Sequence, residues 1–121
     1  MKAVHLICKR DDAGNLNLVS RVHDGYRSCC WAIPFVKASL LIDGWIYLHP
    51  QKKALSEFGG KISRVEPVQW EGKDRVAFIF DAKREARGAP WRGLDNTMAW
   101  TSGVIDASYD HEIGVENAAR S

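Results

Sequence analysis

The sequence predicts a small, strand-rich α+β domain with a curved mixed or antiparallel sheet, or a barrel, of about six or seven strands and one main helix. Two observations predict this class. Short apolar segments with an alternating pattern outnumber segments with helical spacing. Turn-forming residues separate neighbouring segments, so we expect hairpins rather than repeated helical crossovers. A doubly wound parallel sheet is therefore disfavoured.

The first half of the chain contains the expected helix. Extended segments are expected at Ala3–Lys9, Leu16–His23, Arg27–Ile33 and Trp45–Leu48. The first two are joined by a stretch rich in turn formers, so we predict that they form a hairpin. Pro34 fits the first position of a helix, and Gly44 fits its C-terminal cap. Because Phe35, Ala38 and Leu41 recur at helical spacing between them, the predicted helix is Pro34–Asp43.

The second half is read as mostly strand. One or two helical turns are expected at Lys52–Phe58, followed by an edge strand at Lys61–Val68, a turn at Gln69–Asp74 and a central strand at Arg75–Phe80. The edge position follows from Pro67, which cannot donate a backbone hydrogen bond. A long connection at Asp81–Asn96 and a last strand at Thr97–Ile105 complete the predicted order.

The length and charge of the chain suit one domain with a basic body. The 121 residues are 45% hydrophobic, which is enough for one core. We expect residues 1–121 to be a single domain with a core over about 3–105 and a peripheral tail at 106–121. The tail carries four acidic residues and one basic residue, so the rest of the chain holds 16 basic and 11 acidic residues, a charge of +5. A basic body suits an anionic ligand.

The cysteine pattern and the N-terminus indicate a cytoplasmic protein. The three cysteines are odd in number and two of them, Cys29 and Cys30, are adjacent. This is not the pattern of a disulfide framework, and it favours a reducing compartment. The N-terminus lacks a signal peptide, and no apolar stretch is long enough to span a membrane, so we expect no membrane partner.

The order of these segments resembles the PUA-like superfamily. The resemblance rests on the helix ending at Gly44, the strand Trp45–His49, the Gly59-Gly60 stop and the late segment Met98-Ala99-Trp100-Thr101-Ser102-Gly103. The ASCH and EVE branches of this superfamily are small barrels that bind RNA or modified bases, so the resemblance implies such a fold and such a ligand. The ASCH signature Gly-x-Lys-x-x-Glu-x-Arg does not continue after Gly60-Lys61. The small size and the composition also resemble orphan proteins of mobile gene cassettes.

A basic loop with one tryptophan is the best candidate binding site. Trp91 lies in Gly88–Gly93, which has neither strand nor helix spacing, between Arg87 and Arg92. A tryptophan beside arginines is what base stacking over a phosphate-binding rim requires. The alternative is a lid residue that folds back over an apolar opening. We expect the loop to meet the strand end at His49 and the final strand at Trp100 and Ser102.

Three further residues are assigned to this surface. His49 is a candidate hydrogen-bond donor of the pocket, Lys52 could extend the basic rim, and Trp31 is balanced between a core residue and a ligand contact. The histidines and cysteines do not have metal-ligand spacing, so no metal and no cofactor are expected.

Three functions stay open. The first is a binding module with an aromatic pocket and a basic rim, for RNA or DNA or for a modified base. The second is a small enzyme that acts on nucleotides or RNA, with His49 and a nearby lysine or Glu57 in acid–base roles. The third is a protein-interaction or homodimer module with an apolar surface.

Overall fold

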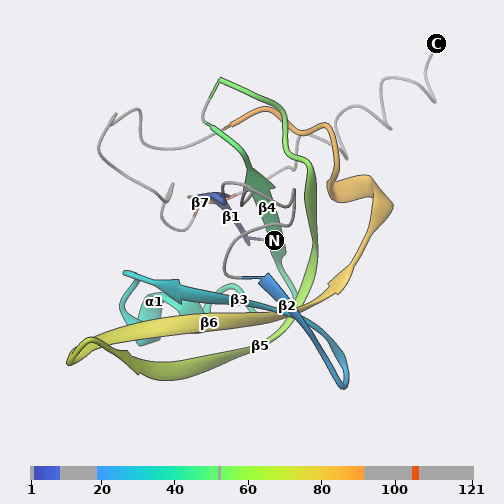
Figure 1. Cartoon of the computed structure of the whole chain (residues 1–121). Helices are drawn as coiled ribbons and strands as arrows, with labels where there is room; N and C mark the ends of the chain where they lie inside the picture. The colour runs from blue at the N-terminus through green and yellow to red at the C-terminus, as the bar shows by residue number, and fades with distance from the viewer. Residues whose placement is uncertain (1, 9–18, 52, 92–104, 107–121) are drawn as a thin grey trace, which may run out of the picture.

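One mixed sheet carries the fold. A computed structural model describes residues 2–8, 19–51, 53–91 and 105–106. The strands are β1 (Lys2–Ile7), β2 (Val19–Val22), β3 (Gly25–Trp31), β4 (Trp45–His49), β5 (Phe58–Trp70), β6 (Lys73–Ala82) and β7 (Ile105–Asp106). They are ordered β2-β3-β6-β5-β4-β1-β7 (Figure 1). Within the described residues the sheet is open, with β2 and β7 at its edges, which confirms a strand-rich α+β fold but not a closed barrel.

The partner of β1 differs from the prediction. The predicted hairpin between Ala3–Lys9 and Leu16–His23 is wrong, because β1 pairs in parallel with β4 and antiparallel with β7. The strand that does form a hairpin with β2 is β3. Residues 3–6 of β1 are buried, so both faces of the strand are covered, which suits a strand in the interior of a sheet.

β5 and β6 form a long hairpin at the centre of the sheet. β6 lies between β3 and β5, so the predicted central strand at Arg75–Phe80 is confirmed. The prediction of an edge strand at Lys61–Val68 holds in part: β5 pairs with β4 over Phe58–Lys61, and beyond Lys61 its only strand partner among the described residues is β6. Pro67 lies beyond that paired stretch. Because β4 does not pair with β5 there, the missing N–H of Pro67 costs no hydrogen bond to β4.

The helical segments are shorter than predicted. Helix α1 covers Phe35–Ser39, and a turn completes the segment as far as Gly44. Ala38 and Leu41 are buried and hold this segment against the sheet. Residues 53–57 are not helical, so the expected helical turns before Gly59 are wrong, and the second helical element is a 3-10 turn, η1, at Arg84–Ala86.

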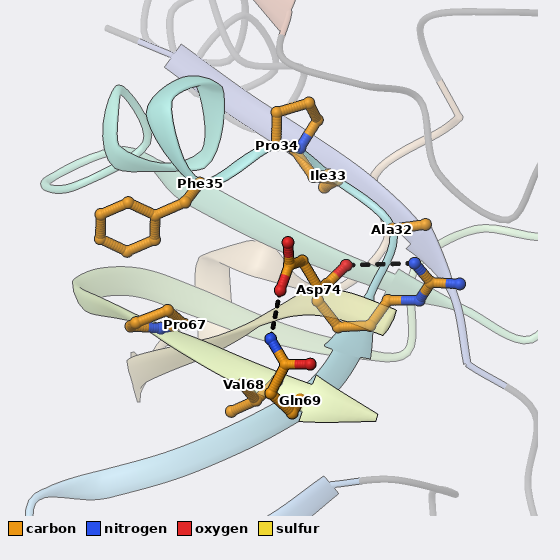
Figure 2. Close-up of a pocket in the computed structure, with 9 residues that line it drawn as sticks. Ala32, Ile33, Pro34, Phe35, Pro67, Val68, Gln69 and Asp74 are labelled. Atoms are coloured by element: carbon orange, nitrogen blue, oxygen red, sulfur yellow. Dashed lines mark hydrogen bonds between the residues drawn. The ribbon is translucent and has the colours of Figure 1, made fainter. Parts of the chain in front are cut away.

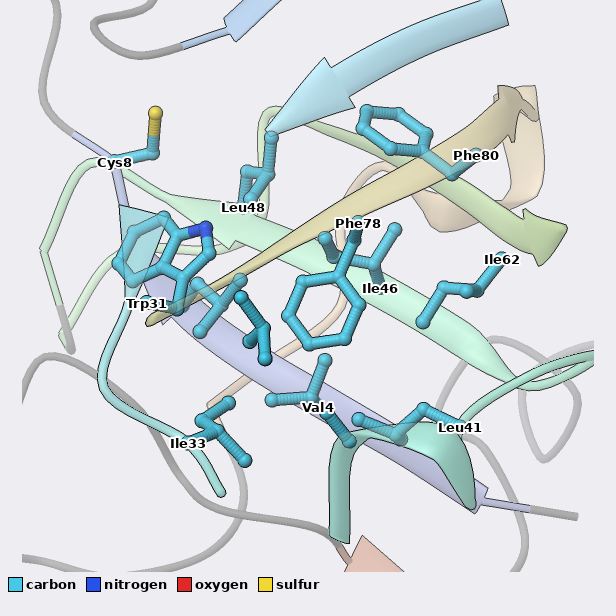
Figure 3. Close-up of a cluster of buried hydrophobic side chains, with 13 residues drawn as sticks. Val4, Cys8, Trp31, Ile33, Leu41, Ile46, Leu48, Ile62, Phe78 and Phe80 are labelled. Carbon is cyan, nitrogen blue, oxygen red and sulfur yellow. The ribbon is translucent and has the colours of Figure 1, made fainter. Parts of the chain in front are cut away.

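The main core lies on one face of the sheet. It gathers apolar side chains from β1, β3, α1, β4, β5 and β6: Val4, Leu6, Cys8, Trp31, Ile33, Ala38, Leu41, Ile46, Leu48, Ile62, Val76, Phe78 and Phe80 (Figure 3). Trp31 is 6% exposed in this core, and its indole N–H donates to Ser28 Oγ at 2.9 Å. Of its two predicted roles, core residue or ligand contact, Trp31 takes the position of a core residue, packed among apolar side chains.

The adjacent cysteines are joined. Cys29 and Cys30 form a disulfide in β3, and Cys8 is a buried cysteine outside this bond. The sequence pattern did not predict this bond, since a pairing of neighbours lies outside the spacings of a disulfide framework. No helix in the described part of the chain is long and apolar enough to cross a membrane.

Candidate functional site

A cluster of rings lies on the face of β1 and β4 that points away from the main core. Strand alternation places Ala3 and His5 of β1 on this face, together with Trp45, Tyr47 and His49 of β4. In the parallel register His5 is opposite Tyr47, and Ile7 is opposite His49. Pairing of these two strands thus brings together side chains that are 44 residues apart in sequence. We call His5, Tyr47, His49 and Trp91 the histidine cluster.

The two histidines of this cluster are hydrogen-bonded to each other. His5 Nδ1 lies 2.7 Å from His49 Nε2, and the residues are 1% and 0% exposed. His49 Nδ1 lies 2.9 Å from the carbonyl oxygen of Ala54, which only accepts, so Nδ1 carries the proton. In the neutral pair His49 Nε2 then accepts from the Nδ1–H of His5. The lone pair of His5 is consequently on Nε2.

Burial controls the protonation of His49. It lowers the pKa of His49, because the charged imidazolium loses hydration. The hydrogen bond to the Ala54 carbonyl raises the pKa and offsets part of this effect. His49 is therefore neutral at pH 7, in the state that can accept a hydrogen bond at Nε2.

Aromatic rings enclose the histidine pair. The rings of His5 and Tyr47 stack with centroids 4.7 Å apart and an interplanar angle of 20°. The Trp91 ring is 5.7 Å from that of His5 and 5.2 Å from that of His49, tilted by 55° and 70°. Trp91 is half-buried, whereas the other three residues of the cluster are buried. Trp91 is therefore the member through which the cluster reaches the surface.

Ser56 holds the segment that carries Trp91. Its Oγ donates to the carbonyl of Ala86 at 2.6 Å and accepts from the N–H of Ala89 at 2.9 Å. Its backbone N–H donates to the Ala89 carbonyl and its own carbonyl accepts from the N–H of Gly88, both at 2.8 Å. Ala86 and Ala89 pack with Ala3, Trp45 and Tyr47 in a second apolar cluster. These contacts fix residues 86–89 beside β4 and so place Trp91 over the histidines.

Basic side chains flank this segment. Lys83, Arg84 and Arg87 are exposed, with Glu85 as the one acidic residue among them. Lys83 forms an ion pair with Asp81 at 2.9 Å, and the Arg87 guanidinium lies 6.0 Å from the centre of the Phe58 ring. Residues 83–87 thus carry a net charge of +2 close to the histidine cluster.

The structure brings some of the predicted site residues together. His49 and Trp91 are in ring contact, and Arg87 lies in the segment that leads to Trp91. Lys52, Arg92, Trp100 and Ser102 lie outside the described residues. The sequence interpretation missed His5, because β1 was assigned to a hairpin with the next strand. The signal that could have revealed His5 was the matching alternation of the two strands, Ala3-x-His5 in one and Trp45-x-Tyr47-x-His49 in the other.

A groove elsewhere on the molecule has different chemistry. It has a volume of about 730 Å³ and lies between the link from β3 to α1 and the far end of the β5–β6 hairpin (Figure 2). Its lining includes Ile33, Phe35 and Val68, and at one end Gln69 donates a hydrogen bond to Asp74. No residue of the histidine cluster lines it. The described residues contain no group of three metal-ligating side chains, here or at the histidine cluster.

Comparisons with protein-family models, with curated proteins and with solved structures found no match to this chain.

Proposed function

We propose that this protein is a nucleic-acid-binding module that holds a base, including a modified base, against the histidine cluster. The observation that carries the proposal is the position of Trp91. Its ring lies against His5 and His49 and remains partly exposed, while the same segment presents Arg84 and Arg87 to solvent. A half-exposed indole beside cations suits a base that stacks while its phosphates meet the rim.

The chemistry of the cluster suits a heteroaromatic ligand. Nucleobases present ring faces for stacking, and the half-buried Trp91 ring lies against the rings of His5 and His49. A PUA-like relationship is part of this proposal, supported by the order of a mixed, curved sheet with one short helix before β4.

Oligonucleotide titration tests the proposal. Labelled single-stranded RNA, single-stranded DNA and duplex are titrated at two salt concentrations by fluorescence anisotropy. Trp91→Ala should weaken binding by about 1–3 kcal/mol, the usual loss when a stacking residue is removed. Arg87→Gln should lower the slope of log K against log salt by about 0.7 for a single strand.

Phe35→Ala is the matched control, because Phe35 is an exposed aromatic residue of α1 that lies outside the cluster. It should bind like the wild type. If no nucleic acid binds at low salt, the proposal is rejected. If Trp91→Ala and Arg87→Gln bind like Phe35→Ala, the base does not bind at this cluster.

The hydrogen bond between the histidines favours a second candidate, an enzyme that acts on nucleotides or RNA. In this candidate the hydrogen-bonded pair of His5 and His49 is the acid–base group, because burial holds His49 neutral with its proton on Nδ1. The test is to incubate matched RNA and DNA oligomers with the wild type, His5→Gln and His49→Gln. Cleavage of the RNA that is lost in both variants would favour the enzyme, and unchanged oligomers would reject it.

A further inference from the structure

The hairpin of β5 and β6 extends beyond the strands that flank it. β4 pairs with β5 only over Phe58–Lys61, and β3 pairs with β6 as far as Val76. Residues 68–75 therefore form a two-stranded arm, which projects from the sheet in Figure 1. Glu71 and Gly72 make its turn with positive φ angles of 51° and 76°. The arm is part of the fold without being covered by a neighbouring strand in the described structure.

The register sorts the side chains of the arm into two faces. Val68 is opposite Arg75 and Trp70 is opposite Lys73, so these four side chains share one face. Gln69 and Asp74 share the other face and are hydrogen-bonded to each other. We call Val68, Trp70, Lys73 and Arg75 the outer arm face. It carries two cations and no carboxylate.

Trp70 is the most unusual member of this face. Its side chain is 47% exposed, although tryptophan is among the residues that gain most from burial. The arm has only two strands at this point, so no core is available to the indole. An exposed ring on a two-stranded ribbon is accessible to a planar ligand.

The two cations of the outer arm face form no ion pair among the described residues, unlike the arginines nearer the base of the hairpin. Arg27 pairs with Glu66 at 3.2 Å, and Arg64 pairs with Asp24 and Glu66. Among the described residues, no carboxylate lies within ion-pair distance of Lys73 or Arg75. The contact found for Arg75 is a hydrogen bond from its Nη1 to the carbonyl of Asp74 at 3.1 Å. Among the described residues, Lys73 and Arg75 therefore form no ion pair.

The face of β6 that carries Lys73 and Arg75 is exposed at both ends of the strand and buried in its middle, at Ala77 and Ile79. Alternation along β6 places Lys73, Arg75, Asp81 and the following Lys83 on one side, and Lys83 has an extended backbone. Ten residues of strand span about 33 Å. β6 thus runs from the tip of the arm to the segment that contains η1 (Figure 1).

We propose that the outer arm face is a second contact surface for single-stranded nucleic acid, with Trp70 stacking on a base and Lys73 and Arg75 contacting phosphates. This inference rests on the proposed function and adds a contact surface at the other end of β6. A single strand fits better than a duplex, because the faces of bases in a duplex are already stacked.

The test measures the affinity of the intact chain for a labelled 20-nucleotide pyrimidine strand and for the duplex of the same length. Trp70→Ala should weaken single-strand binding by about five- to 150-fold, and Trp70→Phe should keep most of the affinity because a ring remains. The double variant Lys73→Gln/Arg75→Gln should lower the salt slope by about 1.4. Lys37→Gln is a control on the exposed surface of α1 and should change neither quantity.

The outcomes separate this inference from the proposed function. If Trp91→Ala weakens binding and Trp70→Ala does not, the arm surface is rejected and the function stands. If the wild type binds no oligonucleotide, both are rejected. If Trp70→Ala changes the sedimentation of the protein from dimer to monomer and leaves the affinity unchanged, the arm is a protein interface and the inference is overturned. Circular dichroism of each variant shows whether the fold is retained.

Discussion

His5 Nδ1 and His49 Nε2 lie 2.7 Å apart in a fully buried position, between strands that run parallel and begin 43 residues apart. The Ala54 carbonyl fixes which nitrogen of His49 carries its proton. This arrangement requires both imidazoles to be neutral, so the contribution of the pair to the free energy of unfolding depends on pH.

The first prediction concerns that dependence. The folded pKa of His49 is lowered by burial, whereas the unfolded chain has the ordinary value of about 6.5. The unfolded state thus binds the proton first, so the contribution of His49 is complete above pH 6.5. It is lost as the pH falls from there through the lowered folded pKa.

Urea unfolding between pH 8 and pH 5 measures this loss. The free energy of unfolding of the wild type should fall below pH 6.5 with a slope of up to about 1.4 kcal/mol per pH unit from this one group. His49→Gln should be less stable at pH 8 but should show a shallower fall. Parallel pH profiles of the two proteins would contradict the prediction.

The second prediction concerns Ser56. Ser56→Ala removes the partner of the Ala86 carbonyl and of the Ala89 N–H, both of which are buried. Leaving such groups without a partner costs about 1–3 kcal/mol in the free energy of unfolding. Amide hydrogen exchange at residues 86–91 should also become faster, because the segment loses its anchor.

Ser63→Ala is the control for Ser56. Its Oγ donates to the Ile79 carbonyl at 3.1 Å in a part-buried position, where water can replace the lost bond. Its cost should be below about 1 kcal/mol. Equal costs for the two variants would show that Ser56 does not hold the segment.

The third prediction concerns the close approach of β5 and β6. A Cβ on Gly60 would lie 1.9 Å from the carbonyl oxygen of Asp81, so Gly60→Ala forces the two backbones apart. We expect a loss of about 3 kcal/mol or more in the free energy of unfolding. In Gly72→Ala, at the turn of the arm, the new Cβ would meet no atom within 4 Å. The free energy of unfolding should fall only by the strain of the positive φ angle, about 1–2 kcal/mol. Thermal and urea unfolding should rank the variants in this order.

The fourth prediction concerns the C-terminus. A chain that ends at Ala107 keeps β7, which pairs with β1 through Lys2 and Ala3. The removed residues are mostly small or polar in sequence, so the free energy of unfolding should change by less than about 0.5 kcal/mol. A chain that ends at Val104 loses that pairing and should be less stable. If the first truncation unfolds the protein, residues 108–121 contribute to the core.

Local pattern was sufficient to locate several elements. Alternation identified Arg75–Phe80, and β6 is the central strand there because its apolar residues are buried on both faces. Helical spacing located α1, although only Phe35–Ser39 is helical. The shorter helix has a physical reason: Leu41 reaches the core from a turn, so burial of that residue does not require further helix.

The local sequence pattern could not identify which strands pair with each other. Alternation in Ala3–Lys9 shows that the segment is a strand with two apolar faces, but it does not name the neighbour. A nearby turn sequence favoured a hairpin, because closing a short loop costs less entropy than closing a long one. The burial available beside β4 outweighed that cost.

The sequence by itself determined the class of the domain, the positions of most strands and the presence of a tryptophan in a basic segment. Only the tertiary structure decided that Trp91 meets His49 and that His5 completes the cluster. The reason is that propensity and periodicity act over neighbouring residues, while the contact of His5 with His49 depends on one parallel register and on the anchoring of a distant segment by Ser56. Those are interactions between residues far apart in sequence, and folding alone brings them together.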